Sequence, residues 1–467
     1  MIEGLQPYSE YNESEQKWLG RIPAHWSLLP NRALFEEVKD RNHPNEEMLS
    51  VTITRGIIQQ KALLTDTSKK DSSNVNKGAY KLVQPGDIAY NKMRAWQGAV
   101  GASSFRGIIS PAYVVMRPRK DCTPWYYHHL YRTPSFAKEA ERWSYGITSD
   151  MWSLRPEHFK VIYSVQPPPD EQAAIVRFLE HANQKIDGFI RAKRKLIGLL
   201  NEQKQAIIHR AVTRGLDPHA TLKPSGIPWL GDIPQEWTPQ RLKNVCRIRG
   251  GYAFKTDSFR DAGVPVIRMS NLRRGRLDLA DAVRIAPADC VAGFELKEGD
   301  VLYGLSGSIG ETGSLGNFAV VRAGDMPAQL NQRVARFRPE ERELLVRFLV
   351  FMLQTSVFYD QVLADTTGTA QFNVSTNDVG RVTFALPSTA QQTEICDWLD
   401  TELSRPNELI ARTEREIALM QEYRTRLTAD VVTGKLDVRP AAAHLPDSTP
   451  ETATEAPDEN EREENEP

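Results

Sequence analysis

Cysteine is scarce in this chain, and its few cysteines are not arranged for any cysteine chemistry. The 467 residues include four cysteines, and no two of them have the C-x-x-C spacing. This pattern argues against a disulfide framework or a zinc site and indicates reduced thiols. No apolar run approaches 18 residues, so no membrane span is expected. The first residues lack the basic and apolar regions of a secretory signal, and a cytoplasmic location is therefore expected.

Signatures of catalytic sites are also missing. The sequence contains no G-x-x-x-x-G-K-S/T phosphate loop, no G-x-S-x-G elbow and no H-E-x-x-H motif. Asp289, Glu295 and Lys297 superficially resemble the acidic-plus-lysine pattern of a metal-dependent nuclease, but a surface turn before a strand is the simpler interpretation. We therefore expect no catalytic residue, no metal and no cofactor in this chain, with a nuclease as the alternative from the enzyme class.

Charge is distributed unevenly. The formal net charge is −1, but residues 440–467 alone carry −8, which leaves +7 for the rest. This C-terminal segment is rich in Glu, Pro, Ala and Thr, so a disordered acidic tail is predicted over residues 439–467. The mildly basic remainder permits a polyanionic partner.

The most informative feature present is an internal repeat. The frame Trp-Leu-Gly-x-Ile-Pro-x-x-Trp occurs at Trp18–Trp26 and again at Trp229–Trp237, an offset of 211 residues. Further identities follow at offsets of 213 to 222: Gly86-Asp87 with Gly299-Asp300, Arg117-Pro118 with Arg338-Pro339, Thr133 with Thr355, Gln172 with Gln392, and Thr213 with Thr433. The drift in offset indicates loop insertions between two copies of one module. Such copies can lie about a pseudo-twofold axis, and the tryptophans of the frame are expected to pack where each module begins.

Each copy predicts the same order of elements. Short β-branched runs alternate with Gly and Pro turns, which is typical of strands. A short helix follows in the first copy, with Thr123 as its N-cap, Pro124 at its first position and an end near Tyr131. The second copy has a longer apolar stretch from Glu343 to Phe358 at the same place.

A long helix then closes each copy. In the first copy an apolar seam repeats every seven residues, through Ile175, Leu179, Ala182, Ile186, Phe189, Leu196, Leu200 and Ile207. Five heptads of this kind predict a coiled-coil helix. Pro406 falls inside the second seam and predicts a kink or a restart there. Because one such helix alone leaves its seam exposed, the simplest expectation is that the two helices pair in antiparallel.

Several polar and aromatic side chains are suited to reading DNA. Arginine can form two hydrogen bonds with guanine, and asparagine or glutamine can form two with adenine. The candidate DNA-binding residues are Lys92, Arg94, Trp96 and Gln97 in the first copy, and Arg268, Asn271, Arg273, Arg274, Arg276, Gln332 and Arg333 in the second. A solvated loop is the competing interpretation for the first-copy group.

The ordered set of motifs resembles a known family. Besides the duplicated frame, the chain has Pro-Pro-Pro-Asp-Glu-Gln-x-x-Ile at 167–175, Thr-x-Gly-Leu-Asp at 213–217, Asn-Lys-Met-Arg-Ala-Trp-Gln-Gly at 91–98 and Val-Pro-Val-Ile-Arg-Met-Ser-Asn-Leu at 264–272. Together they resemble the specificity subunit of type I restriction–modification enzymes. The resemblance extends from about Ser14 to Asp437.

This resemblance implies an α+β fold with two α/β target-recognition domains in pseudo-twofold repeat, separated by two long helices that form an antiparallel coiled coil. The domains would be 1–168 and 217–388, with the coiled-coil helices at 169–216 and 389–438. The family also implies double-stranded DNA, two adenine-N6 methyltransferase (modification) subunits and motor-nuclease (restriction) subunits as partners. S-adenosylmethionine, ATP and magnesium would belong to those partners, so the chain itself would be non-catalytic.

The two copies differ almost everywhere outside their shared frame. The two half-sites should therefore differ, and a helix of about 40 residues is roughly 60 Å long, which suits a bipartite, asymmetric DNA site with an unread spacer. A protein-binding coiled-coil scaffold without DNA specificity remains the other alternative.

Overall fold

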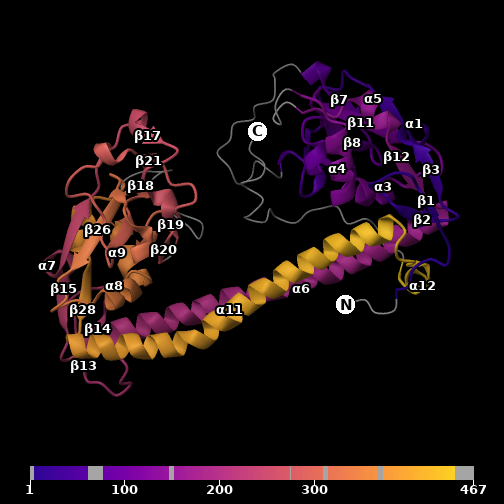
Figure 1. The fold of residues 1–467 in the computed structure, drawn as a ribbon. Helices are drawn as coiled ribbons and strands as arrows, with labels where there is room; N and C mark the ends of the chain where they lie inside the picture. Colours follow the sequence, from indigo (N-terminus) through magenta and orange to yellow (C-terminus); the bar gives the residue numbers. More distant parts are fainter. Residues whose placement is uncertain are drawn as a thin grey trace. The chain divides into compact units, whose positions relative to one another are not determined.

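The computed structural model describes residues 5–61, 77–146, 152–273, 275–308, 314–364 and 372–446. The chain divides into two compact units (Figure 1). Unit 1 combines Met1–Lys193 with Arg415–Pro467, and unit 2 is Arg194–Glu414. Each unit therefore contains a part of both long helices, α6 (Pro169–Arg214) and α11 (Thr389–Val432).

Unit 1 is built on an antiparallel four-stranded sheet in the order β4-β11-β8-β9. These strands are β4 (Phe35–Val38), β11 (Tyr113–Pro118), β8 (Ile88–Asn91) and β9 (Val100–Ala102). The shorter elements are β1 (Tyr11–Glu13), β2 (Arg21–Pro23), β3 (Ser27–Pro30), α1 (Asn31–Leu34), β5 (Leu49–Thr52), β6 (Gly56–Gln59), η1 (Lys77–Ala79), β7 (Lys81–Val83), η2 (Ala95–Gln97), β10 (Gly107–Ile109), α3 (Pro124–Tyr131), α4 (Pro134–Arg142), α5 (Pro156–Val161) and β12 (Tyr163–Gln166). Aromatic rings from α3, including Tyr127 and Tyr131, are fully buried against Phe35 of the sheet.

Unit 2 repeats this plan with a sheet in the order β16-β26-β22-β24. These strands are β16 (Cys246–Gly250), β26 (Val334–Pro339), β22 (Val301–Gly304) and β24 (Phe318–Val320). The other elements are β13 (Leu222–Pro224), β14 (Asp232–Pro234), β15 (Thr238–Arg241), α7 (Leu242–Val245), η4 (Thr256–Ser258), β17 (Phe259–Arg260), β18 (Val264–Ile267), η5 (Met269–Asn271), β19 (Leu272–Arg273), β20 (Arg276–Leu277), β21 (Arg284–Ile285), η6 (Pro287–Asp289), β23 (Ser306–Gly307), η7 (Ala323–Asp325), β25 (Gln329–Leu330), α8 (Val346–Met352), α9 (Ser356–Ala364), β27 (Phe372–Asn373), α10 (Thr376–Arg381) and β28 (Thr383–Leu386). The hairpin β19–β20 stands at the same place in the chain order as the hairpin β5–β6 of unit 1, and the two hairpins contact the matched sheet strands β24 and β9.

Residues matched by the repeat make matched ion pairs. Asp87 accepts hydrogen bonds from Arg117 at 2.8 and 2.9 Å, and Asp300 accepts them from Arg338 at 2.5 and 2.8 Å. Both aspartates are buried, and each pair joins the start of one strand to the end of its neighbour. The repeat in the sequence is therefore a repeat of specific contacts.

The matched glutamines show the same duplication. The Gln172 side chain accepts from the backbone N–H of Thr123 at 2.7 Å and donates to the carbonyl oxygen of Pro167 at 2.8 Å. The Gln392 side chain accepts from Leu345 at 2.8 Å and donates to Pro387 at 3.0 Å. In both units this amide fastens the first turn of a long helix to the chain that leads into a shorter one.

The short helix predicted in the first copy is confirmed, since α3 begins at Pro124 after Thr123 and ends at Tyr131. The apolar stretch of the second copy is instead two helices, α8 and α9. The Thr355 hydroxyl accepts a hydrogen bond from the N–H of Phe358 at 3.4 Å, just as Thr133 accepts from Phe136 at the start of α4. A threonine cap therefore restarts the helix within a mostly apolar run.

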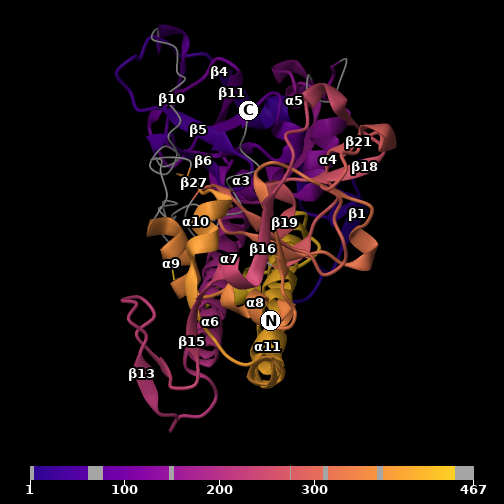
Figure 2. The same cartoon turned by 90° about the vertical axis from the view of Figure 1, so that its left-hand side faces the viewer.

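The two long helices, α6 (Pro169–Arg214) and α11 (Thr389–Val432), lie side by side in both units (Figures 1 and 2). In unit 1, Lys193 forms an ion pair with Glu416 at 2.7 Å, and Asp187 forms one with Arg424. Residue numbers thus fall along one helix as they rise along the other, which confirms the antiparallel pairing. The helix does not restart at Pro406, which lies inside α11, so a prediction of a restart there is wrong. The neighbouring seam residue Leu403 is buried in the core of unit 2, and such packing can offset the backbone hydrogen bond that a proline removes.

Each frame packs against the end of a long helix. A side chain at Gly215 would lie 3.3 Å from the ring of Trp237, and one at Gly434 would lie 2.9 Å from the ring of Trp26. Both glycines have positive φ and end their helices, as expected for glycine after a helix. The predicted packing of the frame is confirmed for these two tryptophans and for Trp18, but Trp229 is 53% exposed and does not share it.

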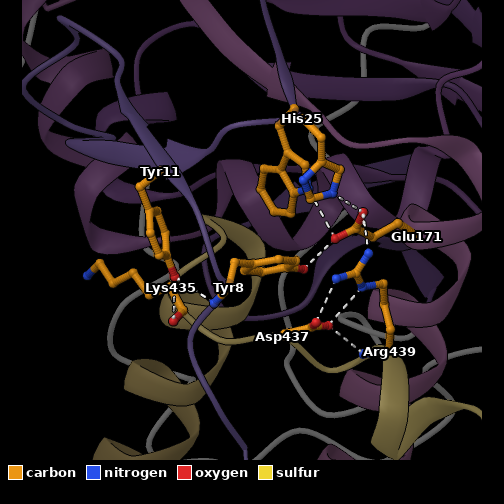
Figure 3. Close-up of polar contacts among 8 residues, drawn as sticks. Tyr8, Tyr11, His25, Glu171, Lys435, Asp437 and Arg439 are labelled. Atoms are coloured by element: carbon orange, nitrogen blue, oxygen red, sulfur yellow. Dashed lines mark hydrogen bonds and ion pairs between the residues drawn. The ribbon is translucent and has the colours of Figure 1, made fainter.

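In unit 1 a buried carboxylate, that of Glu171, ties the frame to the chain that follows α11 (Figure 3). It accepts from the indole N–H of Trp26 at 3.0 Å and from the Tyr8 hydroxyl, and it lies 2.8 Å from the His25 ring nitrogen. Arg439 lies 4.0 Å from the same carboxylate. Burial, with the adjacent Glu171 charge, raises the pKa of Tyr8.

The predicted disordered tail begins too early at residue 439. Residues Arg439–Ala442 form a short helix, α12, and Val438 and Ala442 are buried in the core of unit 1. The apolar side chains at the start of the segment make this packing favourable despite the acidic residues that follow. The remainder of the predicted tail, residues 447–467, lies outside the described residues. In the described part of the chain, no helix is both long enough and apolar enough to cross a membrane.

Candidate nucleic-acid interface

In unit 2 two of the predicted groups meet at the ends of adjacent parallel strands. Ile267 of β18 pairs with Leu330 of β25. Arg268 follows the first strand directly, and Gln332 and Arg333 follow the second within three residues. Because parallel strands end at the same edge, the fold brings together residues that are more than 60 positions apart in the sequence. Gln332 and Arg333 are exposed, and Arg333 donates to the Asn373 side chain at 3.2 Å.

Arg268 is the most enclosed of these cations. Its Nε atom is buried and has no hydrogen-bond partner among the residues that the structure describes. A buried donor without a partner is costly, so such a group is a natural position for a ligand acceptor.

Asn271 has a structural part in the same surface. Its side chain is buried, accepts from the N–H of Arg268 at 2.9 Å and donates to the carbonyl oxygen of Asp278 at 3.0 Å. Because both its amide oxygen and its amide nitrogen are already hydrogen-bonded, Asn271 is arranged to position the arginines around it. Its predicted contact with a base finds no support in this geometry.

Two of the predicted arginines oppose each other on a tight hairpin. Arg273 of β19 pairs with Arg276 of β20, and both are exposed. Like charges directly opposite in a sheet repel each other. Arg273 has a carboxylate nearby, that of Asp278 at 3.7 Å, and an anion at the tip of the hairpin would relieve the repulsion further. Arg274 lies outside the described residues.

Sequence reasoning missed one exposed aromatic residue at this edge. Tyr252 is 42% exposed and forms a bridge with Asn331, immediately before Gln332. The paired glycines before it were the only sequence signal, since a glycine within a strand pattern marks a close backbone approach.

In unit 1 the predicted residues occupy the loop that joins β8 to β9. Trp96 is only partly exposed: its N–H donates to the carbonyl oxygen of Met93 at 2.9 Å, and its ring contacts that of Trp152 edge-on at 5.5 Å. Gln97 is exposed, whereas Lys92 and Arg94 are half-buried. The tryptophan thus shapes the loop that presents the polar side chains.

Arg132 of unit 1 joins this loop to a second one. Its guanidinium donates to the carbonyl oxygens of Gly98 at 3.4 Å and Val100 at 3.0 Å, next to the predicted loop. It also donates to Ile53 at 2.7 Å and to Thr54, which lie in the turn between β5 and β6. One side chain therefore sets the relative position of two exposed loops.

We predict that Arg132→Ala lowers the free energy of unfolding by about 2 kcal/mol, because several carbonyl oxygens lose a charged donor. Chemical denaturation would measure this loss, and hydrogen exchange should rise in both 53–56 and 92–100. The repeat supplies a control, since Gln354 stands at the matched position in unit 2 and its side chain donates to the carbonyl oxygen of Val350, four residues earlier in the chain. Equal effects for Gln354→Ala and Arg132→Ala would contradict the assignment.

The residues of the alternative nuclease site have other roles. Glu295 accepts from the N–H of Gly293 at 2.7 Å and caps its own turn, and Asp289 lies in η6. The N–H of Lys297 donates to Asp300, a carboxylate already paired with Arg338. Within the described ranges, no group of three or more His, Cys, Asp or Glu side chains could hold a metal ion. The geometry gives no support to a nuclease centre here.

The four cysteines are free. Burial raises the pKa of Cys246 to about 12 and that of Cys396 to about 11. Buried thiols of this kind are poor nucleophiles at neutral pH.

Comparison with known proteins shows what the chain is similar to. Residues 234–419 match the family model described as "Type I restriction modification DNA specificity domain". The chain is 25% identical over 456 residues to the type I restriction enzyme MjaVIII specificity subunit of Methanocaldococcus jannaschii, which covers 94% of this chain and 99% of that protein. Residues 234–419 thus match a type I specificity domain, and over nearly its whole length the chain is similar to a type I specificity subunit.

Other similarities agree with this family. The EcoAI specificity subunit of Escherichia coli is 23% identical over 278 residues, which cover 58% of this chain and 46% of that protein. A chain solved under "Structural basis underlying complex assembly and conformational transition of the type I R-M system" has a TM-score of 0.62 at 16% identity, with 89% of this chain and 99% of that chain covered. This likeness confirms the α+β fold with a coiled coil. The names of these relatives agree with the prediction of a specificity subunit.

Proposed function

We propose that this specificity subunit reads a bipartite, asymmetric DNA site, with one half-site contacted by each unit. The observation that carries the proposal is a duplicated scaffold with dissimilar exposed loops. The ion pairs of Asp87 and Asp300 are equivalent, whereas the matched hairpins carry different side chains next to their turns: β19–β20 of unit 2 pairs Arg273 with Arg276, and β5–β6 of unit 1 pairs Thr52 with Gly56. Equal frames that present different side chains suit two different half-sites.

The target-recognition domains in this proposal are residues 1–168 and 217–388, and the spacer is formed by 169–216 and 389–438. The 46 residues of α6 correspond to roughly 69 Å of helix. Successive major grooves on one face of DNA recur about every 34–36 Å, so a spacer of this length supports a site with an unread centre.

The proposed protein partners are two adenine-N6 methyltransferase subunits and the motor-nuclease subunits of a type I complex. The exposed apolar side chains on the long helices support a protein-docking role: Leu199 of α6, and Trp398, Leu409 and Leu419 of α11. In this proposal S-adenosylmethionine, ATP and magnesium bind to the partners, and the complex works in the cytoplasm.

Methylome sequencing tests the proposal as a whole. A host strain with the gene should carry adenine methylation at one gapped, asymmetric motif, and the deletion strain should lack it. If the purified complex binds DNA without sequence preference, or without the salt dependence that phosphate contacts produce, the chain is a protein scaffold instead.

The arginine hairpin supplies a sharper prediction. Arg273→Ala and Arg276→Ala should each weaken binding by about 1–3 kcal/mol if they contact bases, and should then relax one half-site only. A phosphate contact would instead weaken binding to every sequence alike and lower the salt slope by about one. Fluorescence anisotropy over a salt series measures both quantities.

Arg247→Ala is a matched control in the same unit, because this arginine is 81% exposed and paired with Glu340 outside the proposed surface. A loss of affinity for Arg247→Ala as large as that for Arg273→Ala would place the DNA elsewhere.

A further inference from the structure

Tyr252 is an exposed aromatic residue whose backbone is held beside Asn331 and Gln332. Its N–H donates to the carbonyl oxygen of Leu330, and its own carbonyl oxygen accepts from the N–H of Gln332, both at 2.9 Å. Both backbone groups of Tyr252 are thus hydrogen-bonded to the end of β25 and the residues that follow it. Tyrosine combines an apolar ring with a polar hydroxyl group, and it is enriched at contact surfaces for this reason.

The approach of the two segments depends on Gly251. A side chain there would lie 2.1 Å from the carbonyl oxygen of Asn331 and 2.6 Å from that of Leu330. Only glycine allows the two backbone segments to lie this close. Gly251 therefore makes it possible for Tyr252 to lie next to Asn331.

Neighbouring rings limit what Tyr252 can do. Its ring centroid lies 5.0 Å from that of Phe254 and 5.5 Å from that of Phe294. Phe294 is held in turn by the Arg249 guanidinium, 4.3 Å from its centroid. The two ring contacts of Tyr252, one edge-on at 71° and one tilted at 54°, hold its ring in place. It can still present an apolar edge to the groove.

We infer that Tyr252 contacts the C5-methyl group of a thymine in the half-site read by unit 2, and so specifies one A·T pair. The methyl group is the one apolar feature that a base pair presents in the major groove, and it is absent from G·C pairs. Arg268, Gln332 and Arg333 provide polar contacts at the same edge, and Tyr252 adds the apolar one. This inference rests on the proposed function.

The test couples a protein change to a DNA change. The chain is purified in complex with the proposed methyltransferase subunits, and its gapped motif is synthesised with deoxyuridine in place of each thymine in turn, on both strands. Loss of one contacted methyl group should weaken wild-type binding about fourfold at a single position. Tyr252→Ala should bind the native site about tenfold more weakly and should no longer respond to deoxyuridine at that position.

Two further variants keep the result decisive. Tyr252→Phe retains the ring and should keep the full deoxyuridine response, whereas Tyr145→Ala removes a tyrosine of unit 1 that is 60% exposed and should leave the response unchanged. The same deoxyuridine penalty in wild type and Tyr252→Ala, or no penalty at any thymine, overturns the inference. Both results leave the proposed function intact provided that the wild type binds its motif specifically, whereas a wild type without specific binding overturns the proposed function itself.

Discussion

Glu171→Ala should lower the free energy of unfolding of unit 1 by about 3–5 kcal/mol. The Glu171 side chain is 2% exposed and accepts from the indole of Trp26 and the hydroxyl of Tyr8 (Figure 3). Removing it leaves both donors buried without an acceptor, at a cost of about 1–3 kcal/mol each. The positive charge of Arg439 also loses a buried partner.

The location of the loss distinguishes this prediction from general instability. Glu171 joins the first turn of α6 to the first frame and to the segment after α11, so hydrogen exchange should rise first in 5–26 and 435–446. Exchange in unit 2 should stay near its original rate. A uniform rise in exchange over both units would show that Glu171 has no special role in joining these three segments.

The repeat provides a matched control. Gln391 stands where Glu171 stands in the first copy, yet it is only partly buried and donates to Glu236 at 3.4 Å. Gln391→Ala should cost less than about 1 kcal/mol. Glu171→Gln should give an intermediate loss, since an amide oxygen can still accept from Trp26 and Tyr8 while the charge opposite Arg439 is gone.

Gly434→Ala is expected to cost about 3 kcal/mol or more. The residue has φ of +78°, where a side chain is strained by about 1–2 kcal/mol. Its added methyl group would also lie 2.4 Å from Cδ of Pro23 and 2.9 Å from the ring of Trp26. Overpacking of this kind adds about 1–3 kcal/mol, because a proline and a buried indole cannot both withdraw.

Gly215→Ala is a control that distinguishes the backbone strain at Gly434 from the steric clash there. Gly215 has a similar φ of +74°, but its nearest neighbour would be the ring of Trp237 at 3.3 Å. Its cost should therefore be about 1–2 kcal/mol, close to the strain alone. Denaturant unfolding with hydrogen exchange would assign each loss to its unit, and equal costs at the two glycines would refute the proposed contact with Pro23.

The sequence alone determined the duplicated scaffold. Asp87 matches Asp300, and Gln172 matches Gln392, by their positions in the repeat, because contacts that build a module must recur wherever the module recurs. The heptad seam likewise predicted two long helices, since a repeat of seven leaves one continuous apolar stripe that only a partner helix can cover. Even the helix start at Pro124 followed from local chemistry.

Only the tertiary structure decided which polar residues can meet a ligand. Asn271 and Arg273 stand two positions apart and look equally suited to DNA, yet one is buried and bonded to backbone while the other is exposed. Sequence spacing could not distinguish them, because strands of two residues carry no periodic pattern. Tyr252 and Arg132 were missed for a related reason: their roles come from contacts with Asn331 and with Ile53, residues 79 positions away in both cases. Sequence periodicity shows which face of a helix or strand is buried. The residues that contact that element are decided by the pairing of segments far apart in the sequence.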